Sequence, residues 1–351
     1  MQRRALPLAC ASLLAGAARP GWAERPALRV LAWPGYAEAE VLQAFEEQQG
    51  ARVELTLIDT DEALWQRLSA REGADFDVLA LNTVELRRAR QAGLLRPLEP
   101  ARIPRLARQL PRFQRRSAIP GLELKQDGQT ALYGVPFTYA EMGLIHDRRR
   151  LPDPPSSIKA LWEPRWRGKV LAYNGGSHNF TLAAQSLGLA APFRLQSADW
   201  PRAVERLIAL RRNVLGFYSQ PEESVRLFQR HGAALMFANY GTQQLQLLRK
   251  AGADVGYAIP REGALAWLDC WALTRNARQL DLAHAWIDHL LGEQASTLLV
   301  QRQGLANTVS EPEGRAADAR LLWLEPVEDV ARREALWARI RSGDRAERVL
   351  A

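Results

Sequence analysis

Three successive pairs of a predicted strand and a predicted helix constrain the fold of this chain more than any other feature. Each strand is a short apolar run, and each helix has apolar residues at helical spacing. The pairs lie at 28–33 with 37–49, at 52–58 with 62–71, and at 76–81 with 82–93. Because parallel strands joined by helices make right-handed crossovers, the pattern predicts an α/β fold with a doubly wound parallel sheet.

The carboxyl ends of the first and third predicted strands carry a candidate ligand site. In open α/β sheets, ligands bind beyond these ends. Trp33 and Tyr36 follow the first strand, and Asn82 and Thr83 follow the third. We therefore expect these residues to line one wall of a ligand site. For the two aromatic rings, packing over the core is the alternative.

The chain is long enough for two lobes, because 351 residues exceed the roughly 100–200 that are typical of one domain. A further set of strands is predicted at 168–173, 233–239, 257–260 and 263–273, with helices at 179–187, 200–212, 282–291 and 293–301. We expect a first lobe made of residues 24–133 and about 270–305, and a second made of residues 134–269 and about 306–351.

Residues 1–23 have the layout of a secretory signal peptide. Arg3 and Arg4 precede an apolar run that ends at Ala18, and Gly21-Trp22-Ala23 offers small residues at a cleavage site. The apolar run is too short to span a bilayer comfortably, and no later segment reaches the ~20 apolar residues that a membrane helix needs. We therefore expect a periplasmic protein. Export by the general route or by the twin-arginine route both stay open.

The formal charge of +8 and the isoelectric point near 9.9 raise the question of nucleic-acid binding. Only four of the 47 basic residues are lysines, and no nucleic-acid-binding motif accompanies the arginines. We therefore expect no nucleic-acid partner. Cys10 lies in the expected signal peptide, so Cys270 would be alone and could form no internal disulfide.

No catalytic or cofactor motif stands out. The chain has no Gly-x-Ser-x-Gly, no Gly-x-x-x-x-Gly-Lys-Ser/Thr, and no Gly-x-Gly-x-x-Gly after the first strand. His284 and His289 are five residues apart, about 140° around a helix, so they do not indicate a shared metal ion. We expect neither a metal nor a cofactor.

The turn Gly-Gly-Ser-His at 175–178 links a predicted strand to a predicted helix. Backbone N–H groups at a helix start favour an anion, and His178 can add a proton. Ser177 and His178 are therefore candidates for holding an anionic group of a ligand. An ordinary loop, with Ser177 as the N-cap of the helix, is the alternative.

An acidic residue stands among aromatic ones in the sequence Trp-Leu-Asp-Cys-Trp at 267–271. In a strand, Trp267, Asp269 and Trp271 would share one face. A carboxylate in such apolar surroundings is costly unless a cation or hydrogen-bond donors satisfy it. Asp269 is therefore a candidate anchor for a cationic ligand. A turn cap or an ion pair with an arginine is the alternative.

Six segments spread over nearly the whole mature chain carry a family resemblance: 28–36, 75–78, 133–137, 162–169, 259–263 and 267–269. In this order they resemble the spermidine/putrescine-binding family of solute-binding proteins of ABC importers. The resemblance implies a type II periplasmic binding protein fold. In that fold, two α/β lobes joined by a hinge close on a ligand in the cleft between them, and the protein then docks on a membrane permease.

The resemblance also implies roles for individual residues. The family places an aromatic residue and an aspartate where Trp267 and Asp269 stand, and the carboxylate holds a ligand amine. Trp33 and Tyr36 match an aromatic wall for the aliphatic part of a polyamine. Tyr139 matches a further aromatic position of the family.

The chain departs from this family at four places. The family has an acid where this chain has Gly35, aromatic residues where it has Val84 and Leu305, and acids on the turn at 174–178. Only Asp269 remains of the expected acids. We therefore hypothesise a ligand with an amine near Asp269 and a carboxylate or phosphonate near Ser177.

These observations predict a monomeric periplasmic solute-binding protein without catalytic activity, which captures a polyamine or a related amine or zwitterion for import. The rival from another class is a secreted enzyme that uses Asp269 and His178 as an acid/base pair. It lacks an accompanying nucleophile, metal set or second paired acid. A ligand-sensing protein is the third alternative.

Overall fold

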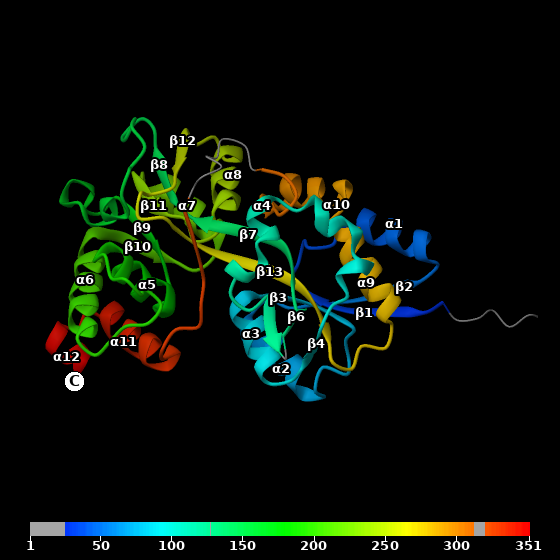
Figure 1. Cartoon of the computed structure of the whole chain (residues 1–351). Coiled ribbons are helices and arrows are strands. Elements are labelled where there is room, and N and C mark those ends of the chain that lie inside the picture. The colour runs from blue at the N-terminus through cyan, green and yellow to red at the C-terminus, as the bar shows by residue number, and fades with distance from the viewer. Residues whose placement is uncertain (1–24, 127, 312–319) are drawn as a thin grey trace, which may run out of the picture.

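The computed structural model describes residues 25–126, 128–311 and 320–351. Its strands form two large sheets, together with a small sheet of β5 (Glu123–Gln126) and β6 (Gln129–Leu132). Figure 1 shows the two large sheets next to each other, each with its own helices. This arrangement confirms the expected fold of two α/β lobes. The expected signal peptide at 1–23 lies outside the described residues.

The first sheet has the strand order β14-β7-β13-β3-β1-β2, and β4 and β15 pair with parts of β13. We call this sheet with its helices the first lobe. Its strands are β1 (Ala27–Ala32), β2 (Arg52–Leu57), β3 (Val78–Asn82), β4 (Leu95–Arg96), β7 (Val135–Met142), β13 (Ala264–Thr274), β14 (Ala306–Asn307) and β15 (Leu321–Trp323). Its helices are α1 (Ala39–Gln49), α2 (Asp61–Ala70), α3 (Thr83–Gln91), α4 (Pro111–Gln114), α9 (Leu280–Leu290) and α10 (Glu293–Leu298).

The three predicted strand–helix pairs are confirmed, because β1 pairs in parallel with both β2 and β3. The sheet as a whole is mixed, since β13 runs antiparallel to β3 and to β7. Local sequence sets the ends of the helices. The Thr60 hydroxyl accepts from the Ala63 N–H at the start of α2, and α1 ends at Gly50, whose φ is 60°.

The second sheet has the strand order β10-β9-β11-β8-β12, and we call it with its helices the second lobe. Its strands are β8 (Leu144–Asp147), β9 (Val170–Tyr173), β10 (Val214–Tyr218), β11 (Leu235–Phe237) and β12 (Val255–Ala258). Its helices are α5 (Gly176–Ser186), α6 (Asp199–Asn213), α7 (Pro221–His231), α8 (Thr242–Lys250), α11 (Val330–Ser342) and α12 (Ala346–Leu350). Short 3-10 turns lie at Pro100–Arg102, Pro104–Arg108, Arg116–Ala118, Ile158–Trp162 and Pro164–Trp166, and a π-helical turn lies at Leu299–Gln303.

The chain passes from one sheet to the other at Gly143, at residues 259–263 and at residues 324–329. Gly143 joins β7 directly to β8, and its N–H donates to the Tyr257 hydroxyl at 3.0 Å. A Cβ at this position would lie 2.6 Å from the Tyr257 ring, so the crossing requires a residue without a side chain. Figure 1 shows β7 and β13 extending from the first lobe toward the second.

The lobe boundaries expected at 133/134 and 269/270 do not coincide with the sheet boundaries. They would separate β7 and half of β13 from the first sheet, although both strands pair with each other from Val135 to Met142. Hydrogen bonding along these long strands holds them in one sheet. The two sheets thus do not follow the expected boundaries, and the division of the chain into lobes stays a prediction.

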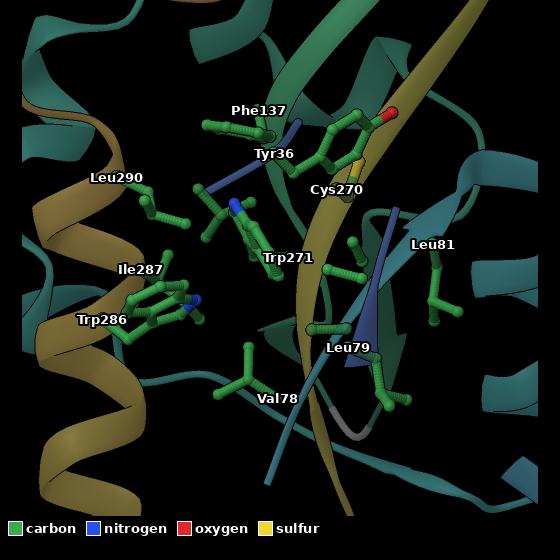
Figure 2. Close-up of a cluster of buried hydrophobic side chains, with 14 of the residues drawn as sticks. Tyr36, Val78, Leu79, Leu81, Phe137, Cys270, Trp271, Trp286, Ile287 and Leu290 are labelled. Carbon is green, nitrogen blue, oxygen red and sulfur yellow. The ribbon is translucent and has the colours of Figure 1, made fainter. Parts of the chain in front are cut away.

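Each lobe has its own buried core. In the first lobe, Trp271 of β13 and Trp286 of α9 are fully buried, and Figure 2 shows them within a cluster of apolar side chains. In the second lobe, Phe180 of α5 packs against Trp200 of α6. Among the helices that the structure describes, none is long and apolar enough to cross a bilayer.

Candidate ligand site

Tyr36 and Asp269 meet at the carboxyl edge of the first sheet. Tyr36 lies in the turn after β1, and its hydroxyl donates to Asp269 Oδ2 at 2.6 Å. Asp269 lies in β13 directly opposite Asn82, the last residue of β3. Two segments that are 233 residues apart are thus joined at the edge where ligands of such sheets bind.

The Asp269 carboxyl is poorly compensated by the protein. The residue is 6% exposed, and within the described residues its carboxyl accepts one hydrogen bond, from Tyr36. Burial raises the pKa of Asp269 to about 7, although the Tyr36 hydroxyl acts in the opposite direction. Neither the predicted turn cap nor the arginine partner is present in the described part of the chain. A cation beside this carboxyl would supply the stabilisation that burial removes.

The ring of Tyr36 is part of the core rather than an open wall. It packs edge-on against Phe137 and Trp271, with centroids 5.4 and 6.4 Å apart. Figure 2 shows these rings next to β13, with Trp271 directed toward Trp286 on α9. The Tyr36 ring therefore packs in the core, and this packing fixes the direction in which its hydroxyl reaches Asp269.

Trp33 and Gly35 shape the turn that carries Tyr36. Trp33 is half-buried, and its Nε1 is buried without a hydrogen-bond partner among the described residues. Gly35 has a φ of 81°, which permits the Tyr36 N–H to close the turn onto the Trp33 carbonyl at 3.3 Å. A Cβ on Gly35 would lie 2.3 Å from the Gln303 side chain. Gln303 therefore occupies the space at the position where the related family has an acid.

Asn82 and Thr83 follow β3 as expected, but both side chains are engaged in the fold. Asn82 Oδ1 accepts from the N–H groups of Val84 and Glu85 and so caps α3. The buried Thr83 hydroxyl donates to the Leu324 carbonyl at 3.1 Å, where the chain leaves the first sheet. Thr83 is therefore bound to a segment that crosses between the lobes.

The remaining predicted residues of the first lobe are Trp267 and Tyr139. Trp267 is partly buried and packs against the cores of both lobes. Tyr139 is fully buried, and its ring packs on Phe113 and Trp323, with centroids 5.1 and 6.0 Å away. Tyr139 lies opposite Leu268 in the strand pairing, whereas Asp269 lies opposite Thr138. Leu305 is buried in the same core.

In the second lobe, the turn at 175–178 already holds a carboxylate of the chain itself. Glu334 of α11 accepts from the N–H groups of Gly176 and Ser177 at the start of α5, both at 3.1 Å. A Cβ on Gly176 would lie 2.8 Å from the Glu334 carboxyl carbon. An anionic group of a ligand could use these donors only by displacing Glu334.

His178 differs from the proton donor that the sequence suggests. Burial, with a smaller contribution from the Arg333 charge, lowers the pKa of His178 to about 4. The imidazole is therefore neutral near pH 7 and adds no positive charge to the turn. Its ring packs edge-on against Tyr173, with centroids 5.3 Å apart.

Sequence reasoning missed Asp61, which lies beside this site. Asp61 begins α2 after β2, and its Oδ1 accepts from Asn82 Nδ2 at 2.9 Å. Asp61 is exposed, and its charge adds to the raised pKa values of Asp269 and Tyr36. The rule that ligands bind beyond the carboxyl ends of parallel strands would have selected it, because β2 ends four residues before Asp61.

Nothing in the described residues resembles a metal site, since no group of three His, Cys, Asp or Glu side chains is placed to hold an ion. The arrangement instead offers a buried carboxyl, a tyrosine hydroxyl and aromatic surfaces at the carboxyl edge of an α/β lobe. Together with a second α/β lobe, this arrangement is suited to holding a small solute.

Residues 40–311 match the model of the bacterial extracellular solute-binding protein family. Since this match covers more than half of the chain, the protein belongs to that family. The putrescine/agmatine-binding protein of Pseudomonas aeruginosa is 23% identical, with 94% of this chain and 95% of the relative aligned. The spermidine/putrescine-binding periplasmic protein 1 of Haemophilus influenzae is 22% identical, over 76% of this chain and 71% of the relative.

Solved structures show the same fold. The substrate-binding protein PotD of a spermidine/putrescine ABC transporter from Streptococcus pneumoniae superposes with a TM-score of 0.66 at 19% identity, over 78% of this chain and 81% of that one. The binding protein MotA from A. tumefaciens B6, solved with glucopine, gives 0.64 at 14% identity, over 90% and 99%. At these identities, the likeness establishes the fold alone.

Proposed function

We propose that this chain is the periplasmic substrate-binding component of an ABC importer and that it captures a small molecule with a cationic nitrogen. The observation that carries the proposal is the buried Asp269 carboxyl, which has one hydrogen bond, from Tyr36, within the described residues. A ligand ammonium at this position would pair with the carboxylate, and such charge-assisted hydrogen bonds are stronger than neutral ones. The names of the two relatives, which cite putrescine, spermidine and agmatine, support an amine ligand.

An amine is favoured over the zwitterion that the sequence suggests. The N–H groups of Gly176 and Ser177, which were expected to hold an anion, are bound by Glu334. The neutral His178 supplies no charge to replace them. We therefore expect a polyamine or a related amine to bind more tightly than an ω-amino acid of the same length.

The ligand is expected to lie between the two lobes, near Trp33, Tyr36, Trp267 and Asp269 in the first and near the 175–178 turn in the second. Cation–π contact with Trp33 and Trp267 would add about 1–2 kcal/mol to the ion pair with Asp269 when water is excluded. Because each lobe offers only part of these contacts, closure of the lobes would accompany binding.

The test is calorimetry and thermal shift on the mature chain with putrescine, spermidine and 4-aminobutanoate. Ligands that bind the native state raise the melting temperature by mass action. We expect at least one of the two polyamines to bind and Asp269→Asn to lose that binding. If none of the amines binds, or if Asp269→Asn binds as well as the unaltered protein, the proposed function is wrong.

We further propose that the protein binds without catalysis and acts as a monomer. Within the described residues no contact joins Asp269 to His178, so no observation favours the acid/base enzyme. Mass spectrometry of ligand recovered after incubation should return the compound unchanged, and light scattering should give the mass of one chain with and without ligand. Turnover of the compound would favour the enzyme instead.

A further inference from the structure

We propose that Asp61 is a second cation-binding carboxylate of the same site and determines the preference for ligands with two cationic nitrogens. This inference rests on the proposed function, because it assigns a further contact to the ligand that Asp269 holds. It concerns a residue of α2 that neither the sequence motifs nor the family resemblance pointed to.

The first argument is position. Asp61 and Asp269 are both neighbours of Asn82. The Asp61 carboxylate accepts from Asn82 Nδ2, and Asn82 is the strand partner of Asp269. Partners in antiparallel strands have Cα atoms about 4.5–5.5 Å apart. The two carboxylates thus lie on the same sheet edge, with the Asn82 amide between them.

The second argument is proximity to the second lobe. Burial raises the pKa of Tyr173, which ends β9 in the second lobe, and the charges of Glu334 and Asp61 add to this shift. Asn82, whose amide holds Asp61, is followed by Thr83, whose hydroxyl donates to the Leu324 carbonyl in a segment that crosses between the lobes. Asp61 therefore lies near the passage between the lobes, where a ligand held between them would lie.

The third argument is unsatisfied charge. Surrounding protein displaces water and raises the pKa of Asp61, Glu62 raises it further, and the Asn82 hydrogen bond and the Arg88 charge only partly compensate. The side chain is nevertheless exposed. An accessible carboxylate without an ion-pair partner among the described residues is suited to an ammonium group from outside.

A helix-capping role is the competing explanation, because an acid in the first turn of a helix is favoured by the helix dipole. The two roles differ in what they predict. A capping residue affects stability and affects all ligands equally, whereas a second ammonium contact affects only ligands with a second ammonium group.

The experiment compares putrescine with 1-butylamine, which has the same carbon chain and one cationic nitrogen. Calorimetry gives the ratio of the two affinities for the unaltered protein, for Asp61→Asn and for the control Glu62→Gln. Glu62 follows Asp61 in α2 and is also exposed, so the control removes the same charge from the same helix. We expect the ratio to fall about tenfold in Asp61→Asn and to be unchanged in Glu62→Gln.

Three results would overturn the inference. An unchanged ratio in Asp61→Asn, with Asp269→Asn still abolishing binding, removes the role of Asp61 but leaves the proposed function standing. An equal fall for both amines, with a lower melting temperature, assigns Asp61 to helix capping. Absence of binding by either amine to the unaltered protein refutes the proposed function and this inference with it.

Discussion

Two buried aspartates lie near opposite ends of β3, one directly before it and one on the neighbouring strand β13, and the chain pairs their carboxyl groups to different extents. Asp77 directly precedes β3, and Asp269 is paired with Asn82 at the other end. Burial alone would raise the pKa of Asp77, but hydrogen bonds from Arg29 and the Arg278 N–H lower it below its usual value. Burial raises the pKa of Asp269 to about 7.

The difference lies in the number and charge of the donors. Asp77 accepts from the Arg29 N–H and Nε at 3.0 Å, from its Nη2 at 2.8 Å, and from the Arg278 N–H at 2.6 Å. Asp269 accepts from a neutral tyrosine hydroxyl in the described structure. Full pairing by the chain suits a carboxylate that stabilises the fold, whereas the incomplete pairing of Asp269 is what we expect of the ligand anchor that we propose.

The largest expected effect is on stability, at Asp77. Asp77→Asn removes the charge that balances Arg29, and we expect a loss of roughly 3–5 kcal/mol in the free energy of unfolding, measured by urea denaturation. Asp75→Asn is the matched control, because Asp75 pairs with an exposed Arg71 at 2.9 Å and such pairs contribute about 0.2–1 kcal/mol. Equal losses in the two variants would mean that Asp77 contributes no more to stability than an exposed ion pair does.

The next effect is on binding, at Asp269. Asp269→Asn should lose about 2–5 kcal/mol of affinity for the amine found by screening, because a charged hydrogen-bond partner disappears. The ligand-free variant should fold at least as stably as the unaltered protein. Calorimetry and urea denaturation measure the two quantities. A variant that loses stability as Asp77→Asn does would mean that Asp269 serves the fold.

The pH dependence sharpens this expectation. The pKa of Asp269 is raised from its ordinary value near 3.8 to about 7, so its contribution to stability is complete below pH 4 and is lost as the pH rises through 7. At pH 8, ligand-free Asp269→Asn should therefore be more stable than the unaltered protein by roughly 1–4 kcal/mol. Amine affinity should fall below pH 7 by up to about tenfold per unit, as Asp269 takes up a proton next to Tyr36 and Asp61.

A smaller effect is expected at Trp33. Trp33→Ala should weaken amine binding by roughly 1–3 kcal/mol through lost apolar and cation–π contact. Trp166→Ala is the control, because Trp166 is also half-buried, and its buried Nε1 has no hydrogen-bond partner among the described residues. It lies in the second lobe, in the 3-10 turn Pro164–Trp166. Should Trp33→Ala instead lower the melting temperature sharply and keep its affinity, core packing is its role.

The parts of the fold that could be predicted from the sequence are those with a local signal. Apolar runs and helical spacing located β1 to β3 and α1 to α3, and the edge rule located Trp33, Tyr36 and Asn82. Helix α11 was not predicted, because nine of its 13 residues are charged or small and its apolar face is only Leu336, Trp337 and Ile340. Its place against α5 depends on contacts that local periodicity does not report.

Long-range contacts explain why the candidate site was predicted only in part. Glu334 is 158 residues away from Gly176 in the chain, and yet it accepts from the Gly176 N–H at the start of α5. The sequence therefore suggested that this N–H was free for a ligand, whereas in the structure it is hydrogen-bonded. The partner of Asp269 was similarly hidden, because Tyr36 looked like a surface for the ligand and is a buried donor. Asp61, in contrast, was within reach of the edge rule and was missed.

The smallest expected effect concerns Glu334, which gives the second lobe its own paired carboxylate. Glu334→Gln keeps the shape but removes the charge at the positive start of the 11-residue helix α5, so we expect a loss of about 0.5–1 kcal/mol of unfolding free energy that shrinks at high salt. Glu347→Gln, at an exposed position in the same C-terminal segment, is the control. Glu334→Ala should free the two donors and raise the affinity for 4-aminobutanoate relative to putrescine. If that ratio stays constant in calorimetry, Glu334 caps the helix without excluding anions from the site.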